Sequence, residues 1–291
     1  MIDTFRDFYY RSTDNLQLYC RLFECESEGE PARPTILCLP GLTRNSRDFI
    51  ELATHLQRRH RVLAPDLRGR GRSAYDPHWE NYQPNSYCAD IAALLQAQNI
   101  SSVVIIGTSL GALLAMLLAI QHPAIIRGIV LNDAGPEIDP AGAERIAGYV
   151  GKPVRVSSWN DAAAQARATY SAALPGLTDA QWLSYTRQSW REREDGIPVP
   201  DSDPNIGQLF RSGAATPPNL WPVFAQLQAL PILVIRGGMS DILSAATVER
   251  MAREKPELQQ LTVANRGHAP LLNEPECVAA IDDFLQRLPA E

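Results

Sequence analysis

A serine flanked by glycines is the residue of this sequence best suited to chemistry. Ser109 stands at the centre of the pattern G-x-S-x-G, between Gly107 and Gly111, with apolar residues on either side at 103–106 and 112–120. A strand that turns abruptly into a helix needs a strained corner residue with small neighbours, and such a corner raises the serine hydroxyl clear of the sheet. The pattern also arises by chance as a plain turn, but this context favours a nucleophile.

A serine hydroxyl is a poor nucleophile near neutral pH and needs a general base. Among the five histidines, only His268 follows the last expected strand and precedes the last expected helix. That loop lies at the carboxyl edge of an open α/β sheet, where such sheets hold their sites. His122 ends the helix after Ser109, where it would complement the helix dipole. We therefore expect His268 to be the base.

The base in turn needs a carboxylate that orients it. Asp241 follows a late strand and precedes His268, so the order Ser109, Asp241, His268 agrees with nucleophile, acid and base in this architecture. Asp133 also follows a core strand and is the alternative, although it could instead orient the loop that carries His268. We expect Asp241 to be the acid.

A serine that attacks a carbonyl also requires donors for the oxygen that becomes negative. The backbone N–H of Leu110, next to Ser109, is one candidate. The N–H of Leu42, in the loop after an early strand, is the other, because Gly41 lets the backbone approach closely there.

Apolar runs without polar alternation predict the strands that must position these residues. The runs cover 35–41, 61–66, 103–109, 128–133, 231–238 and 260–267, and segments of helical spacing cover 47–57, 87–98, 110–121 and 273–288. Such runs suit parallel strands buried on both faces, so the core should be a three-layer α/β sandwich. Residues 5–24 predict an antiparallel hairpin, and Asn273 with Glu276 fits the N-terminal cap of the last helix.

The stretch between 133 and 231 contains no convincing core strand and carries four of the five tryptophans. Helices are expected at 160–174 and after Thr178, whose partner Gln181 completes a capping-box pattern, and 191–207 is expected to be a loop. We therefore expect a helical cap at 135–222, inserted between the core parts 1–134 and 223–291.

The composition excludes several classes of protein. The 291 residues are 45% hydrophobic and 21% charged, and the formal net charge is −6. An acidic balance gives no attraction to nucleic acids or anionic membranes. The five cysteines lack metal-ligand spacing, and the N-terminus lacks the apolar stretch of a signal peptide. We expect a cytoplasmic protein with reduced thiols and no metal, and we leave open whether it forms a homo-oligomer.

Taken in order along the chain, these motifs resemble those of the α/β-hydrolase superfamily. The matching stretches are LPGLTRNSRDF, APDLRGRGRSA, GTSLG, GGMSD and NRGHAPLLNEPE. The chain is similar to capped esterases and enol-lactone hydrolases, which implies a cofactor-free serine hydrolase on a mostly parallel sheet flanked by helices. The family's oxyanion loop usually begins with His-Gly, whereas this one reads Pro40-Gly41, and a backbone donor does not need that histidine. The resemblance also implies that Asp66 and Arg68 hold loops.

Serine at the corner argues against the haloalkane dehalogenases and epoxide hydrolases of this fold, which use aspartate there. We expect a carboxylic ester hydrolase that forms an acyl-enzyme on a small or medium, largely apolar substrate. Arg44, Trp159 and Trp182 are candidates for the substrate pocket, although tryptophans often form a core instead. A lactonase or a carbon–carbon bond hydrolase of aromatic degradation, an acyl transferase, and a ligand receptor with slow turnover are the alternatives.

Overall fold

The computed structural model describes residues 5–27, 33–213 and 219–289. Its centre is an eight-stranded sheet with the strand order β1-β2-β4-β3-β5-β6-β9-β10. The strands are β1 (Arg6–Arg11), β2 (Gln17–Phe23), β3 (Thr35–Leu39), β4 (Val62–Asp66), β5 (Val103–Thr108), β6 (Ile126–Asn132), β9 (Ile232–Gly237) and β10 (Gln259–Val263). β1 and β2 are antiparallel to each other and β2 is antiparallel to β4, whereas all other neighbours are parallel. The predicted hairpin and the mostly parallel sheet are confirmed.

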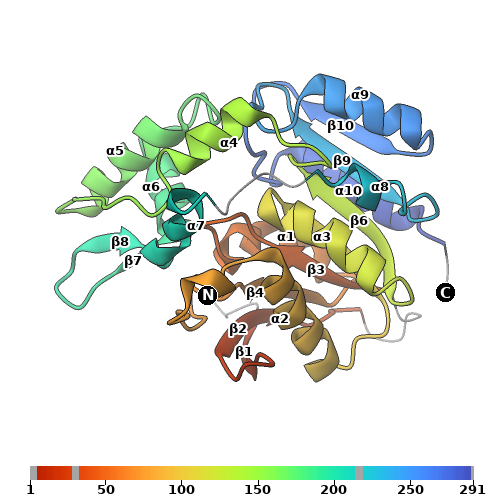
Figure 1. The fold of residues 1–291 in the computed structure, drawn as a ribbon, viewed down its shortest axis with the longest axis horizontal. Coiled ribbons are helices and arrows are strands. Elements are labelled where there is room, and N and C mark those ends of the chain that lie inside the picture. The colour runs from red at the N-terminus through yellow and green to blue at the C-terminus, as the bar shows by residue number, and fades with distance from the viewer. Residues whose placement is uncertain (1–4, 28–32, 214–218, 290–291) are drawn as a thin grey trace.

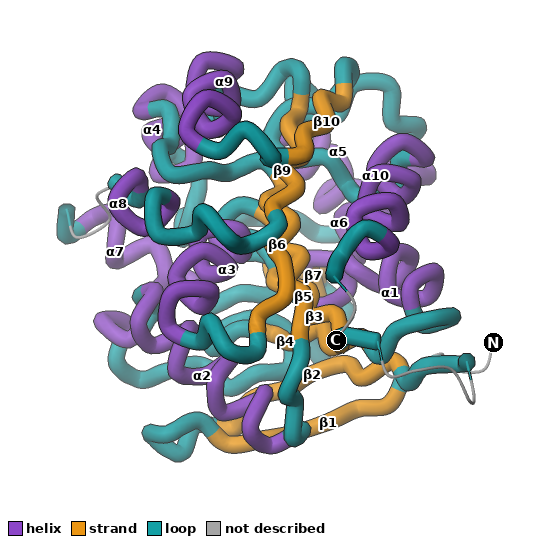
Figure 2. Tube along the Cα trace, turned by 90° about the vertical axis from the view of Figure 1, so that its right-hand side faces the viewer, coloured by secondary structure: helices purple, strands orange, loops and turns teal. Residues whose placement is uncertain are grey.

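Helices cover both faces of this sheet. They are α1 (Ile50–Leu56), α2 (Pro84–Ala97), α3 (Leu110–Gln121), α8 (Trp221–Phe224), α9 (Ala245–Glu254) and α10 (Pro275–Gln286). Figure 2 shows α2, α3, α8 and α9 on one side of the strands and α1 and α10 on the other. The sheet and its two helical layers form the predicted three-layer sandwich.

The alternation of side chains along β3 shows how the two cores arise. Successive residues of a strand point to opposite faces of the sheet. Ile36 and Cys38 are therefore buried under α1 and α10, whereas Leu37 and Leu39 are buried under α2 and α3. Because both faces are covered, the central parallel strands are apolar at nearly every position, which is the pattern that predicted them.

The chain leaves the sheet after β6 and returns to it at β9. Between them lie α4 (Pro140–Ala147), α5 (Trp159–Tyr170), α6 (Asp179–Ser189), β7 (Trp190–Glu192), β8 (Pro198–Pro200) and α7 (Gln208–Arg211). Figure 1 shows α4, α5, α6 and the β7–β8 hairpin together on the left of the molecule. We call residues 135–222 the insertion. Its predicted end at residue 222 falls inside α8, which packs on α3, and its boundaries stay a prediction.

Local details of the insertion and of the last helix test the capping and loop predictions. The capping box of Thr178 and Gln181 is present at the start of α6. The segment predicted as a loop instead contains the short β7–β8 hairpin. The N-cap of α10 is Glu274 rather than Asn273, whose side chain donates to Glu51 of α1. Among the described residues, we find no helix with the length and apolar character that a bilayer crossing requires.

Candidate active site

Ser109 forms the corner between β5 and α3, and its backbone has φ 54° and ψ −114°. A non-glycine residue adopts a positive φ only when the surrounding structure holds it there. The two flanking glycines make the corner compact: a Cβ on Gly107 would lie 2.2 Å from the carbonyl oxygen of Gly111, and one on Gly111 would lie 2.1 Å from that of Leu39. Both positions therefore require glycine, as the strand-to-helix turn predicts.

His268 lies beside Ser109 in the loop between β10 and α10. Its Nε2 is 2.8 Å from Ser109 Oγ, and its Nδ1 is 2.7 Å from Asp133 Oδ2. A carboxylate only accepts hydrogen bonds, so Nδ1 carries a proton that it donates to Asp133. In a neutral imidazole, Nε2 is then left as the acceptor for the serine hydroxyl. The three side chains form a hydrogen-bonded series in which a proton can pass from Ser109 to His268.

Asp133 occupies the position that the sequence assigned to Asp241. It follows β6 directly, it is fully buried, and its oxygens accept hydrogen bonds from the Gly237 N–H at 2.7 Å and the Ser240 hydroxyl at 2.6 Å. With His268, these donors hold the carboxylate from several sides. These hydrogen bonds fix the orientation of the carboxylate toward His268.

The side chain of Asp241 forms no hydrogen bond with His268. The expectation that Asp241 is the acid is therefore corrected, because Asp133 makes this contact instead. The turn after β9 directs Ser240 toward Asp133 and sends the Asp241 side chain to α4, where Arg145 binds it in a bidentate ion pair. These hydrogen bonds from Arg145 lower the pKa of Asp241. Both carboxylates follow neighbouring parallel strands, β6 and β9, so spacing along the chain did not separate them.

The loop that carries Leu42 lies against Ser109, because a Cβ on Gly41 would be 3.7 Å from the Cβ of Ser109. Two hydrogen bonds fix the peptides on either side of Leu42. The Arg44 N–H donates to the carbonyl of Gly41 at 3.1 Å, and Arg70 Nε donates to the carbonyl of Leu42 at 2.8 Å. Leu110 is the first residue of α3, where backbone N–H groups lack partners within the helix.

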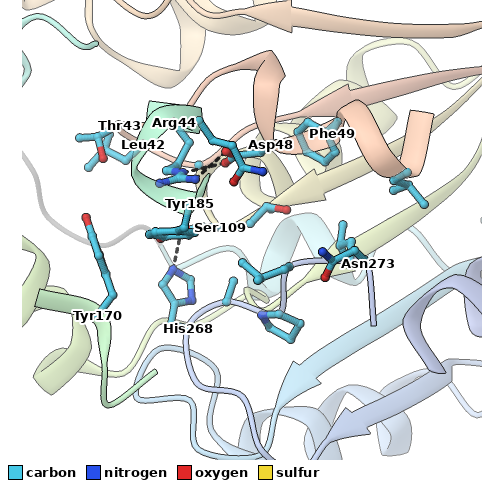
Figure 3. A pocket seen from close by; sticks show the side chains of 18 of the residues that line it. Leu42, Thr43, Arg44, Asp48, Phe49, Ser109, Tyr170, Tyr185, His268 and Asn273 are labelled. Carbon is cyan, nitrogen blue, oxygen red and sulfur yellow. Dashed lines mark hydrogen bonds and ion pairs between the residues drawn. The ribbon is translucent and has the colours of Figure 1, made fainter. Parts of the chain in front are cut away.

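A pocket opens over Ser109 and His268 between the sheet and the insertion (Figure 3). We call it the active-site pocket. The core contributes the Leu42 loop, part of α1 and residues 268–273, and the insertion contributes Ile146, Tyr149, Tyr170, Tyr185 and Gln188. Polar and apolar groups therefore share the wall, which is less apolar than the sequence led us to expect.

The three side chains predicted for the pocket have different locations. Arg44 lines the pocket, where its guanidinium forms a bidentate ion pair with Asp48 and lies 4.3 Å from the centre of the Tyr185 ring. Trp182 is only 3% exposed and packs with the small core of the insertion, and Trp159 donates to Glu192 on the outer side. Neither tryptophan lines the pocket, because Trp182 packs in the core of the insertion and Trp159 contacts Glu192 and Arg187.

Most of the chain matches a known protein family. A family model described as the alpha/beta hydrolase fold matches residues 34–275. The chain belongs to this family. The match covers β3 to β10, the serine corner and the histidine loop, so the resemblance of the motifs is confirmed over most of the chain.

Three known hydrolases are similar to this alpha/beta hydrolase over most of its length. A 3-hydroxybutyrate-oligomer hydrolase from Cupriavidus necator is 34% identical over 265 residues, which cover 88% of this chain and 90% of the relative. A crystal structure of an alpha/beta hydrolase from Novosphingobium aromaticivorans is 43% identical, has a TM-score of 0.92 and covers 99% of this chain and all of its own. A 2-(acetamidomethylene)succinate hydrolase from Mesorhizobium japonicum is 26% identical, over 87% of this chain and 88% of the relative. The chain is therefore a hydrolase of this fold.

Several residues of the site were not singled out from the sequence. Tyr149, Tyr170 and Tyr185 form two edge-to-face ring contacts, each with 5.7 Å between the centroids. Burial raises the pKa of all three phenols, so their hydroxyls stay protonated and can donate. Asn132 donates to Thr108 Oγ1 and to the carbonyl of Pro270, which ties the end of β5 to the histidine loop. Their clustering depends on tertiary contacts for which the sequence gives no spacing signal.

The loop roles implied for Asp66 and Arg68 agree with their contacts. Asp66 accepts hydrogen bonds from the N–H groups of Ser46 and Arg72. Arg68 is 2% exposed and forms ion pairs with Asp14, Asp76 and Asp90. In the described residues, no group of three or more histidine, cysteine, aspartate or glutamate side chains is placed to hold a metal ion.

Proposed function

We propose that this alpha/beta hydrolase cleaves carboxylic esters through an acyl-enzyme on Ser109. The observation that carries the proposal is the hydrogen-bonded series in which His268 contacts Ser109 at 2.8 Å and Asp133 at 2.7 Å. Enzymes that transfer acyl groups covalently place a nucleophile within hydrogen-bond reach of a base, and a third group orients that base.

The reaction follows from these contacts. Ser109 Oγ attacks the ester carbonyl while His268 Nε2 accepts its proton, and Asp133 stabilises the resulting imidazolium. Collapse of the tetrahedral intermediate breaks the carbon–oxygen bond, and His268 gives its proton to the leaving alcohol. Water then attacks the acyl group with His268 again as base, which releases the acid and restores the Ser109 hydroxyl.

The backbone N–H groups of Leu42 and Leu110 are proposed to hold the oxygen that becomes negative. The close approach of Gly41 to Ser109 and the position of Leu110 at the start of α3 support this assignment. The N-terminus of a helix also favours a negative charge. The hydrogen bond from Arg70 to the Leu42 carbonyl supports a fixed orientation of that loop.

The substrate we propose is a short ester of a hydroxy acid. The insertion, residues 135–222, is proposed to act as a cap over the active site. The relative that hydrolyses 3-hydroxybutyrate oligomers supports this class, because such oligomers repeat an ester bond between short aliphatic units. The wall of the active-site pocket suits it as well. Tyrosine hydroxyls can donate to ester carbonyls, and Ile146, Leu271 and Leu272 supply apolar surface for the aliphatic units.

The test combines covalent labelling with turnover. We expect a fluorophosphonate probe to label the protein and p-nitrophenyl butyrate to be hydrolysed, and both activities should vanish in Ser109→Ala. Asp133→Asn should lower kcat by about 10⁴-fold, because the asparagine amide no longer selects the required histidine tautomer. Asp241→Asn, the matched control, should leave kcat close to that of the unmodified protein, because Asp241 binds Arg145 rather than His268.

Persistent turnover in Ser109→Ala would refute the acyl-enzyme. A large loss in Asp241→Asn with little loss in Asp133→Asn would instead assign the acid as the sequence did. Lactones and 1,3-diketones assayed beside the ester distinguish ester cleavage from the other reactions of this fold.

A further inference from the structure

A second pocket adjoins the active-site pocket within the insertion. It is lined by parts of 149–154, 165–170, 189–193 and 199–204, and we call it the insertion pocket. Thr43, Arg44, Tyr149 and Tyr170 line both pockets, so the two meet along these four side chains. In Figure 3, Thr43 and Tyr170, which line both pockets, lie to the left of Ser109.

Cations dominate the charged groups of the insertion pocket. Arg44, Lys152, Arg191 and Arg193 line it, against a single lining carboxylate, that of Asp203. The chain as a whole carries a net charge of −6, so this local excess of positive charge runs against the overall balance. A concave site lined by one sign of charge concentrates ligands of the opposite sign.

The pairing of these groups shows which cations are available to a ligand. Arg44 is neutralised by Asp48, and Arg193 pairs with Asp195. Arg191 Nε lies 3.5 Å from Asp201, and the Arg191 side chain also hydrogen-bonds to Tyr75, whereas none of the described carboxylates forms an ion pair with Lys152. Asp203 already accepts the Tyr82 hydroxyl at 2.5 Å. Lys152 and Arg191 are therefore the cations best placed to meet an anion.

The remaining wall of the insertion pocket is apolar. Val150, Pro153, Val154, Trp190 and Val199 line it beside the two cations. A ligand that fits such a wall has an aliphatic body and an anionic end. An aliphatic ester that also carries a free carboxylate group has such a body and such an end.

We infer that the insertion pocket binds the free carboxylate end of an extended ester acid, through Lys152 and Arg191, while the ester carbonyl lies at Ser109. This inference rests on the proposed function and names the substrate class of the same site. In a linear hydroxy-acid oligomer bound in this way, the free carboxylate belongs to the alcohol part of the ester being cleaved. That part receives the proton from His268 and leaves first, while the acyl part stays on Ser109.

Binding to an inactive protein tests the inference without turnover. The linear trimer of 3-hydroxybutyrate with a free carboxylate, and its methyl ester, are titrated calorimetrically into the Ser109→Ala protein. We expect the acid to bind about tenfold more tightly than the methyl ester, which corresponds to about 1.4 kcal/mol. Adding Lys152→Gln and Arg191→Gln together should remove this difference, and rising salt should weaken it.

Arg167→Gln is the matched control, because Arg167 is an exposed cation of the insertion that lines neither pocket and pairs with Asp179. The control should keep the preference for the acid. Equal affinities for acid and methyl ester in the Ser109→Ala protein would overturn the inference. Equal losses for both ligands in the double variant would also overturn it, because they would indicate a structural role for the two cations.

Turnover separates this inference from the proposed function. With Ser109 intact, the double variant should raise KM for the acid about tenfold and leave the kinetics of the methyl ester unchanged. If neither the acid nor its methyl ester is hydrolysed but the acid still binds preferentially, the proposed function fails and the subsite stands. If both esters are hydrolysed through Ser109 without any preference, the subsite fails and the proposed function stands.

Discussion

Ser109 combines a reactive hydroxyl with a backbone conformation that serine adopts at a cost. Its φ of 54° lies in the region that glycine occupies freely, and the flanking glycines leave no room for the corner to relax. The cost of such a conformation is of order 1–3 kcal/mol. Part of the stability of the fold is therefore used to present the nucleophile.

Replacement of Ser109 by glycine and by alanine separates the backbone effect from the loss of the hydroxyl. Both variants lose the contact with His268, but only glycine relieves the strained φ, while adding about 0.5–1 kcal/mol of unfolded-chain entropy. We expect Ser109→Gly to be about 1 kcal/mol more stable than Ser109→Ala in urea unfolding. A glycine variant that is the less stable of the two would show that the corner carries no strain.

At the scale of elements, the ends of the parallel strands bring the site together. Ser109 directly follows β5, Asp133 directly follows β6, and His268 lies in the loop after β10. The loop after β3 supplies Leu42 and is fixed by the fully buried Arg70, which also donates to the Tyr87 hydroxyl. Arg70 is thus a positioning residue, which acts through the peptide of Leu42.

Removal of Arg70 should disturb that loop more than the rest of the fold. We expect Arg70→Met to lower kcat and the rate of fluorophosphonate labelling about tenfold with little change in KM, because the oxyanion donor acts mainly in the transition state. Arg72→Met, in the same turn but exposed, is the control and should keep both rates. If labelling per folded molecule is unchanged in Arg70→Met, the loop does not depend on this side chain.

The sequence predicted the elements better than it predicted the contacts between them. Apolar runs identify β3, β5, β6 and β9 because strands buried on both faces admit few polar residues. The choice between Asp133 and Asp241 instead depends on a turn after β9 that points Ser240 and Asp241 in different directions. The hairpin of β7 and β8 was missed because three-residue strands next to prolines give no alternating pattern.

The residues that line the active-site pocket were also predicted only in part. Arg44 was identified because it follows the Leu42 loop directly in the sequence. The tyrosines that face it come from three segments of the insertion, and only the packing of α5 and α6 brings them together. Trp159 and Trp182 are aromatic residues of the same insertion, and no spacing signal separates them from the tyrosines of the pocket, yet Trp182 packs in the core of the insertion and Trp159 donates to Glu192.

At the scale of the whole molecule, Arg47 joins the core to the insertion. It lies in the 3₁₀ turn before α1, and it donates to the carbonyls of Gln188 and Trp190 and to Asp201 at 2.6 Å. Asp201 is 3% exposed at its side chain, so loss of this partner leaves a buried carboxylate with only the longer contact to Arg191. The β7–β8 hairpin, which lines the insertion pocket, is thereby tied to the core.

Arg47→Met should loosen the hairpin while the sheet stays intact. We expect limited proteolysis between residues 190 and 200 to become about tenfold faster, the equivalent of about 1.4 kcal/mol of lost local stability. Arg287→Met, which removes an exposed ion pair on α10, is the control and should leave the rate unchanged. Uniform acceleration of cleavage throughout the chain would point to global rather than local opening.

The position of the insertion also affects how the chain is made. β6 ends at Asn132, but its neighbour in the sheet, β9, begins only at Ile232. During synthesis from the N-terminus, one edge of β6 therefore stays without its partner strand while the whole insertion is produced, and open strand edges are sites of aggregation. His268 emerges later still, so the nascent protein carries Ser109 and Asp133 throughout synthesis of the insertion without the base that would activate the serine.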